Sequence, residues 1–259
     1  MGMQYIVICA VALLASCLTF FSGFGLGTLL LPVFALFFPV EQAIAMTAVV
    51  HMLNGLFKLT LVGRHAHWST VLRFGIPAIA AAFLGAWSLQ WLTGLTPVFR
   101  YQLFEQGMAV TPVKLVIGLL LIGFALFELV PRLRDLQFQP RYMPLGGVLS
   151  GFFGGLAGMQ GALRSAFLVR SGLSKEAFIA TGVVIAVMID LSRLGVYSQS
   201  WASTRASLNY PLLAAAVVAA FLGALLGNRF LKKITMPGIQ RLVAASLVVF
   251  AVGLIMGML

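Results

Sequence analysis

Long apolar stretches, separated by short polar connections, run through the whole chain. They cover residues 4–38, 42–62, 71–93, 110–130, 144–169, 176–197, 208–230 and 240–258. A hydrocarbon core about 30 Å thick is crossed by about 20 helical residues, so most of these stretches have the length of one membrane-spanning helix. They lack the strict alternation of a membrane β-strand, so the pattern predicts helices.

Two of the stretches have an anomalous length. Residues 4–38 are too many for one span and marginal for two, and residues 144–169 are many for one span and few for two. We predict that each is a hairpin of short or broken helices that bends near its glycines, because glycine tolerates backbone conformations that other residues avoid. The interior glycines are Gly23, Gly25 and Gly27 in the first stretch, and Gly151, Gly154, Gly155, Gly158 and Gly161 in the second.

The two halves of the chain resemble each other at a constant offset of 134 residues. Without gaps, Ser150 aligns with Ser16, Gly161 with Gly27, Thr181 with Thr47 and Pro211 with Pro77. Single matches mean little in so apolar a chain, but their succession at one offset predicts an internal repeat. The predicted fold is an all-α polytopic membrane protein with two repeats, each of about five segments beginning with a glycine-broken hairpin.

Composition supports this class of protein. The chain is 61% hydrophobic and 9% charged, with a mean hydropathy of +1.05. Soluble domains are about 45–50% apolar and about 25% charged, so the sequence predicts an integral membrane protein. The net charge of +11 does not indicate nucleic-acid binding, because the basic residues are scattered over short connections.

The basic residues also predict the topology. If both hairpins are counted as crossings, whole or partial, the second repeat is inverted and one membrane face collects most of the positive charge. By the positive-inside rule that face is cytoplasmic, and both termini are periplasmic. The predicted division is a first repeat at 1–131, a cytoplasmic linker at 132–143 and a second repeat at 144–259. The basic face holds Arg64, Arg73, Arg132, Arg134, Arg141, Arg170, Lys175, Arg229, Lys232, Lys233 and Arg241, and the other face Arg100, Lys114 and Arg205.

A few strongly polar residues lie inside apolar stretches. Each ionisable group at membrane depth costs about 2.5–3.5 kcal/mol on insertion scales, so such groups face a cavity or a partner. His51, Asn54 and Lys58 are spaced i, i+3, i+7 and share one helix face, as do Asp190, Arg193 and Tyr197. We interpret His51, Asn54, Lys58, Asp190 and Arg193 as a cavity lining, with His51 or Asp190 sensitive to protons.

The hairpin tips are candidates for anion binding. A helix that begins inside the membrane directs unsatisfied N–H groups and the positive end of its dipole at its start, which attracts anions. Arg164 would lie about one turn into the helix that follows Gly161, where its guanidinium could make a two-pronged contact with an oxyanion. The predicted substrate-binding residues are Gly23, Gly25, Gly27, Thr28, Gly158, Gln160, Gly161 and Arg164.

Structural interpretations of the same residues stay open. The pairs Gly23 and Gly27, and Gly151 and Gly155, have the spacing of small residues in helix packing. Arg164 could extend to an interface or pair with Asp190. Asp190 and Arg193 could form a local ion pair, and Lys58 could reach toward the basic face.

Two segments resemble the signatures of a known family. "FSGFGLGTLLLPVFALF" with "VEQAIAMTAVVHMLNG", and later "GGVLSGFFGGLAGMQGALRSAFLVRSGLSKEAFIATGVV", are similar to the first and second signatures of the TauE/SafE sulfite exporter family, also called the 4-toluene sulfonate uptake permease family. The resemblance covers nearly the whole chain. It implies a carrier of sulfur-containing anions in the bacterial inner membrane. The chain departs from the family pattern at Arg164, which interrupts an apolar run, and at Ala166, where repeat one has Pro32.

These observations predict a secondary transporter, and an exporter, of a small sulfur-containing anion such as sulfite or an organosulfonate. The predicted partners are this anion and the lipid bilayer, with no nucleic acid. The sequence predicts no cofactor and no metal, and with three His, two Cys and six acidic residues it offers no catalytic constellation. The alternatives are a non-transporting scaffold or assembly protein and a carrier of a non-sulfur organic anion.

Overall fold

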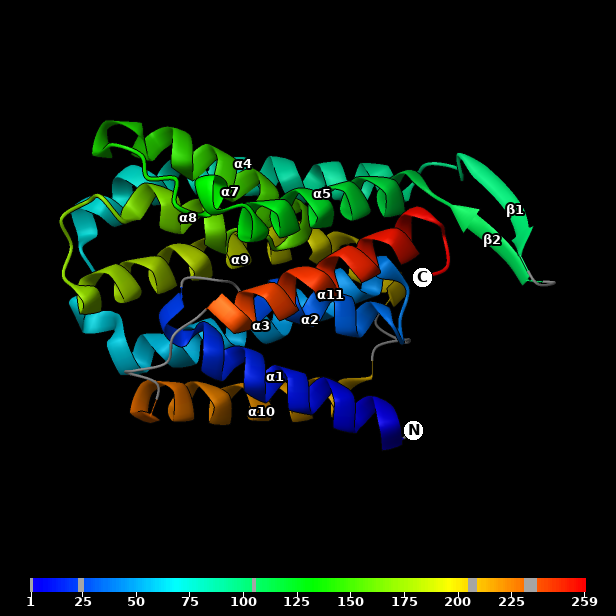
Figure 1. The fold of residues 1–259 in the computed structure, drawn as a ribbon, viewed down its shortest axis with the longest axis horizontal. Coiled ribbons are helices and arrows are strands. Elements are labelled where there is room, and N and C mark those ends of the chain that lie inside the picture. The colour runs from blue at the N-terminus through cyan, green and yellow to red at the C-terminus, as the bar shows by residue number, and fades with distance from the viewer. Residues whose placement is uncertain (1, 23–25, 104–105, 205–208, 231–236) are drawn as a thin grey trace.

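A computed structural model describes residues 2–22, 26–103, 106–204, 209–230 and 237–259 of the chain. The described residues form a bundle of helices that run roughly along one common axis (Figure 1). The predicted all-α membrane fold is confirmed. Five helices, α1, α3, α4, α9 and α10, are long and apolar enough to cross a membrane within the described part of the chain.

The helices follow the predicted apolar stretches. The first half of the chain forms α1 (Gly2–Ser22), α2 (Leu26–Ala35), α3 (Val40–Val62), the 3-10 turn η1 (Gly63–His65), α4 (Trp68–Thr93) and α5 (Pro112–Leu129). The second half forms α6 (Pro131–Arg134), the 3-10 turn η2 (Pro140–Tyr142), α7 (Met143–Ala157), α8 (Gly161–Leu168), α9 (Lys175–Thr204), α10 (Tyr210–Phe230) and α11 (Pro237–Ile255).

Each anomalous stretch is divided between two helices, as predicted. The second member of each hairpin is short: α2 has 10 residues and α8 has 8. At 1.5 Å per residue these helices are about 15 Å and about 12 Å long, roughly half of the hydrocarbon thickness or less. Neither can cross a membrane by itself, so each hairpin turns back inside the bundle.

The hairpins exchange partners between the two halves. Helix α1 packs along α10, and α7 packs along α4, so the long arm of each hairpin lies against a helix of the other half. The remaining pairs, α3 with α9 and α5 with α11, also join corresponding helices. The inverted repeat and the division at 131 and 144 stay predictions, which this reciprocal packing supports.

Close backbone contact explains several glycines of α7. A Cβ atom on Gly151 would lie 2.2 Å from the carbonyl oxygen of Ala78 in α4, and one on Gly155 would lie 2.0 Å from that of Ala82. The packing interpretation therefore holds for these two glycines, because only a residue without a side chain allows the two helices to approach so closely. On α10, Gly223 meets the carbonyl oxygen of Leu13 in the same way.

A two-stranded sheet is the main feature that the sequence did not predict. Strands β1 (Phe99–Leu103) and β2 (Gln106–Val110) pair antiparallel, with Phe99 opposite Val110, and extend beyond the bundle (Figure 1). The Tyr101 hydroxyl donates to the Met256 carbonyl oxygen at 2.5 Å, which ties this sheet to the C-terminal helix. The sequence pattern does not predict this sheet, because five-residue strands carry too little periodicity to be recognised.

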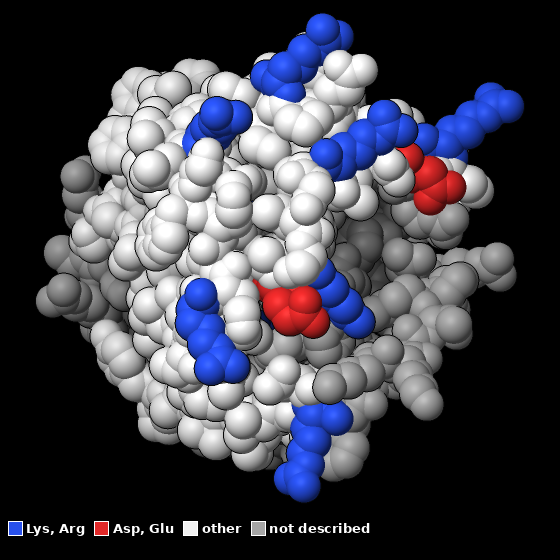
Figure 2. All heavy atoms as spheres, turned by 90° about the vertical axis from the view of Figure 1, so that its left-hand side faces the viewer, with Lys and Arg blue, Asp and Glu red and all other residues white. Residues whose placement is uncertain are grey.

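The two ends of the bundle differ in charge. Both termini lie at the same end, on the right of Figure 1, as the topology requires. Figure 2 shows the opposite end, where basic side chains are spread over the surface. The connections at this end carry exposed Arg64, Arg132, Arg141, Arg170, Lys175 and Arg229. The assignment of this end to the cytoplasm stays a prediction, and Arg205, Lys232 and Lys233 lie outside the described residues.

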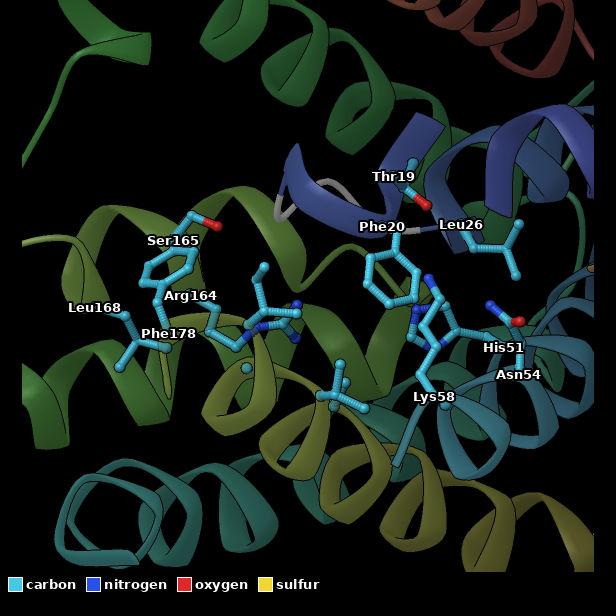
Figure 3. A pocket seen from close by; sticks show the side chains of 15 residues that line it. Thr19, Phe20, Leu26, His51, Asn54, Lys58, Arg164, Ser165, Leu168 and Phe178 are labelled. Atoms are coloured by element: carbon cyan, nitrogen blue, oxygen red, sulfur yellow. The ribbon is translucent and has the colours of Figure 1, made fainter. Parts of the chain in front are cut away.

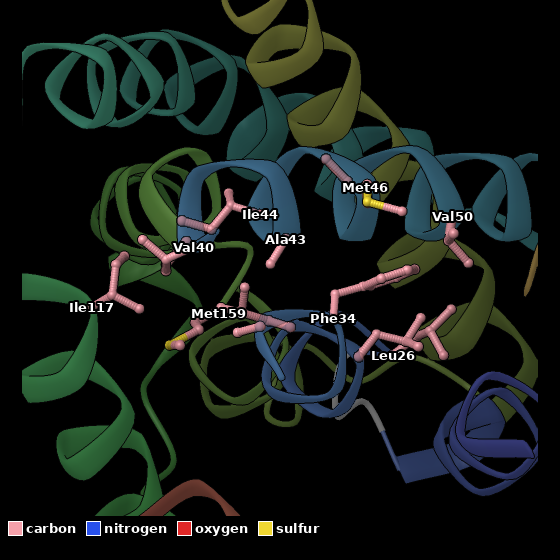
Figure 4. Packing of buried hydrophobic residues seen from close by; sticks show 14 of the residues in the cluster. Leu26, Phe34, Val40, Ala43, Ile44, Met46, Val50, Ile117 and Met159 are labelled. Atoms are coloured by element: carbon pink, nitrogen blue, oxygen red, sulfur yellow. The ribbon is translucent and has the colours of Figure 1, made fainter. Parts of the chain in front are cut away.

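The short helix α2 lies in the centre of the bundle. Leu30 and Phe34 are fully buried, and they share one apolar cluster with Val40 and Ala43 of α3 (Figure 4). Met159, at the tip of the second hairpin, belongs to the same cluster. Helix α2 and the turn of the second hairpin therefore both belong to the core.

Candidate functional site

The start of α2, in the first hairpin, contacts the turn between α7 and α8 in the second. A Cβ atom on Gly27, at the start of α2, would lie 3.3 Å from the carbonyl oxygen of Gly158 and 3.7 Å from Cδ2 of His51. Gly158 ends α7 in the left-handed conformation with φ = 77°, which favours glycine. A side chain there would also collide with Nη1 of Arg193, 2.6 Å from the position of its Cβ.

A cavity of about 60 Å³ opens beside these tips (Figure 3). It is lined by residues of α1, α3, α8 and α9 together with Leu26 of α2. A cavity needs about 10–15 Å³ to admit one water molecule, so this one is large enough for water or a small anion. Its polar lining comprises Thr19, His51, Asn54, Lys58, Arg164 and Ser165.

The sequence prediction of one polar face on α3 agrees with this lining. His51, Asn54 and Lys58 all face the cavity, and all three are buried. Asn54 accepts a hydrogen bond from the Ser16 hydroxyl at 3.2 Å, which holds the amide in place from α1. Lys58 is only 8% exposed, so it does not extend to the surface as one alternative proposed.

Arg164 reaches the cavity from the first turn of α8. Its side chain is buried, and its Nη1 donates to Oε1 of Gln160 at 3.2 Å. The salt bridge to Asp190 that one alternative proposed is not formed, because the carboxylate of Asp190 binds other residues. Lys58 lies on the other side, with its ammonium 5.3 Å from the ring centre of Phe20. Two cations therefore line one small cavity.

Asp190 is the centre of a buried ionic cluster behind the cavity. Its Oδ2 lies 2.5 Å from Nδ1 of His51, and its Oδ1 lies 2.8 Å from Nη2 and 3.0 Å from Nε of Arg193. The local ion pair of Asp190 and Arg193 is thus present, and His51 of α3 joins it. Asp190 and Arg193 have no exposed surface. The cluster therefore links α3 to α9 at the depth of the hairpin tips.

Gln160 connects the cluster to the cavity. Its Nε2 donates to Oδ1 of Asp190 at 3.4 Å, while its Oε1 accepts from Arg164. The Ser150 hydroxyl donates to its backbone carbonyl oxygen at 2.9 Å, which fixes the turn between α7 and α8. A substitution of Asp190 is therefore expected to alter the position of Arg164, because the side-chain amide of Gln160 binds both residues.

The other predicted substrate-binding residues differ in their position relative to the cavity. Gly161 is buried at the start of α8. Thr28 is half-buried and does not line the cavity, and Gly23 and Gly25 lie outside the described residues. Phe20 and Thr19 line the cavity but were missed by sequence reasoning, since nothing distinguishes them from other members of an apolar helix.

A hydrogen bond of Tyr197 joins α9 to α7, and its contribution to stability can be tested. Its buried hydroxyl donates to the carbonyl oxygen of Gly155 at 2.5 Å. We expect Tyr197→Phe to lower stability by about 1 kcal/mol, because the buried carbonyl loses its partner. The thermal unfolding midpoint of the purified protein measures this loss. Tyr210→Phe, at a 55% exposed position, is the control, and equal midpoints for the two variants would contradict the expectation.

Comparison with known proteins now assigns the chain. A family model described as "Sulfite exporter TauE/SafE" matches residues 8–254, which include both hairpins and every residue of the cavity and the ionic cluster. No curated protein matches the chain significantly. The family is one of membrane transporters, in agreement with the apolar helices and the buried polar cavity. The chain therefore belongs to the TauE/SafE sulfite exporter family.

Proposed function

We propose that this protein exports a small sulfur-containing anion, such as sulfite or an organosulfonate, across the bacterial inner membrane with both termini in the periplasm. The observation that carries the proposal is the basic cavity between the hairpin tips, where Lys58 and Arg164 are both buried. Buried cations in a membrane protein mark ion or substrate pathways. The match to the sulfite exporter family supports sulfur as the central atom of the anion.

The chemistry of the lining suits an oxyanion. The guanidinium of Arg164 offers parallel N–H groups that match two oxygens of the anion, and Lys58 adds a point charge. Asn54 offers an amide, whose NH₂ group can donate because its oxygen already accepts from Ser16. The apolar walls from Leu26 and Phe20 exclude water, which strengthens these polar contacts.

His51 is the proposed proton carrier. Its Nδ1 is engaged by Asp190, so only Nε2 can meet a bound anion. The charged groups around His51 are Lys58, Arg164, Asp190 and Arg193. Because His51 lies between Asp190 and the cavity, we expect it to couple transport to protons.

Alternating access would arise from movement of one half against the other around the hairpin tips. The first hairpin contributes Phe20, Leu26 and Gly27, and the second contributes Gly158 and Arg164. Because the long arm of each hairpin packs on a helix of the opposite half, displacement of either half changes both sides of the cavity. This geometry supports alternating access, in which the residues that line the cavity change their contacts each time one half moves.

The test of the proposal is efflux from proteoliposomes loaded with sulfite, thiosulfate, sulfoacetate or a carboxylate. Wild type is expected to release the sulfur anions. Arg164→Ala is expected to reduce the rate by about 100-fold, equivalent to ~3 kcal/mol of lost interaction. Arg164→Lys keeps the positive charge but loses the two parallel N–H donors of the guanidinium, so we expect partial activity.

Arg170→Ala is the matched control, because Arg170 is exposed at the end of the bundle and its Nε donates to Gln137. It should transport like wild type. Normal transport by a correctly inserted Arg164→Ala protein would remove Arg164 from the site. Release of the carboxylate alone would show that the cargo is a non-sulfur anion.

A further inference from the structure

The charges buried in the described part of the bundle do not balance. Five ionisable side chains are buried around the hairpin tips: His51, Lys58, Arg164, Asp190 and Arg193. Three of them are cations and one is a carboxylate. Asp190 is held by Arg193 at 2.8 Å and by His51 at 2.5 Å, so its charge is already compensated within this cluster. With His51 neutral, the site keeps two positive charges.

The two remaining charges belong to Lys58 and Arg164. Within the described residues neither forms a salt bridge: Arg164 donates to the neutral amide of Gln160, and Lys58 lies over the ring of Phe20. Both are 8% exposed. They line the same cavity, where each repels the other and where their burial reduces screening by solvent. Such groups are stable only with a counterion of matching charge.

From this excess of two positive charges, and resting on the proposed function, we infer that the site selects a divalent oxyanion over a monovalent anion of the same size and shape. The class is that of doubly charged sulfur oxyanions, such as sulfate, thiosulfate and the fully deprotonated form of sulfite. A divalent anion neutralises both cations at once. A monovalent sulfonate leaves one buried charge uncompensated.

Lys58 is the residue that sets this preference. Arg164 alone can hold the two oxygens that any sulfonate and any sulfate present, so it does not distinguish them. The ammonium of Lys58 adds the second charge from α3, on the opposite side of the cavity (Figure 3). Its removal leaves a site with one uncompensated cation, which matches a monovalent anion.

Two anions of equal shape but different charge distinguish the effect of charge on affinity from the effect of size. Sulfate and methanesulfonate are both tetrahedral, and one charged oxygen of the first is a methyl group in the second. Binding of each, with thiosulfate as a second dianion, is measured by calorimetry on the purified full-length protein in detergent. We expect wild type to bind at least one dianion about tenfold or more tightly than methanesulfonate.

The variant is Lys58→Met, which keeps the length of the side chain and removes the charge. We expect the ratio of dianion to monoanion affinity to fall about tenfold, toward unity. The thermal midpoint of this variant without added anion is expected to rise, because a repulsive buried charge is removed. Lys114→Met is the matched control, since the Lys114 ammonium donates to the backbone carbonyl oxygens of Ala109 and Gly257 and does not line the cavity.

The outcomes distinguish this inference from the proposed function. If methanesulfonate binds wild type as tightly as the dianions, the divalent preference is wrong while the sulfur-anion carrier stands. An unchanged affinity ratio in Lys58→Met also overturns the inference. If neither the dianions nor methanesulfonate bind wild type, the proposed function itself fails, and the inference fails with it.

Discussion

Gly155→Ala is expected to prevent formation of the native bundle. The added Cβ would lie 2.0 Å from the carbonyl oxygen of Ala82 and 2.7 Å from its carbonyl carbon. These are backbone atoms of α4, so no side chain can rotate away and the helices must separate. Overpacking in a dense core costs about 1–3 kcal/mol and occasionally more, and we expect ~3 kcal/mol or more here because both partners are backbone. The folded fraction after detergent extraction, measured by size-exclusion chromatography, reports the effect.

Gly123→Ala is the control for this expectation. Gly123 lies within α5, and a Cβ atom there meets no other atom within 4 Å. Alanine also favours the helix more than glycine does, so this variant should fold as well as wild type or better. A Gly155→Ala protein with the folded fraction and thermal midpoint of wild type would show that α7 and α4 are not held at this distance.

Asp190→Asn is expected to cause the largest loss among the polar residues. The change leaves the guanidinium of Arg193 as a charge without a carboxylate, in a position with no exposed surface. Removal of one member of a buried ion pair costs about 3–5 kcal/mol, because the other member stays buried. The thermal midpoint should fall accordingly. Transport should also be lost, since His51 loses the negative charge that faces its Nδ1.

The double variant Asp190→Leu with Arg193→Met separates stability from transport. When both charges of a buried pair are replaced by apolar groups, stability is often nearly unchanged. We therefore expect the double variant to recover most of the thermal midpoint and none of the proton-coupled efflux. A midpoint for Asp190→Asn equal to that of wild type would contradict the role of this carboxylate as the centre of the cluster.

Much of the fold could be predicted from the sequence, because membrane helices have a physical signature within the chain itself. Apolar length determines whether a segment can span, and glycines in an apolar stretch of the wrong length indicated the broken hairpins. The short helices α2 and α8 confirm both hairpins. The sheet of β1 and β2 was missed, because its five-residue strands carry too little periodicity and the hydrogen bond from Tyr101 to Met256 joins residues distant in the sequence.

The helix faces of the site could be predicted in the same local way. The spacing of His51, Asn54 and Lys58 placed them on one side of α3, and all three line the cavity. The role of each glycine could not be predicted, since packing and ligand approach require the same residue. Gly151 and Gly155 serve packing against α4, whereas Gly27 and Gly158 bring the hairpin tips into contact.

The class of the protein, the two hairpins and the shared face of the polar residues on α3 could be predicted from the sequence, because these depend on length, hydropathy and helical period. The partners of the buried polar residues become known only from the packed helices. Lys58, Arg164 and Arg193 are all possible partners of the Asp190 carboxylate, and the sequence alone does not show which of them binds it. Arg193 pairs with Asp190 from one turn away on α9, the packing of α3 on α9 adds His51, and Lys58 and Arg164 face the cavity. The contact with His51 depends on a distance of a few ångströms between two helices, which arises only when the helices pack.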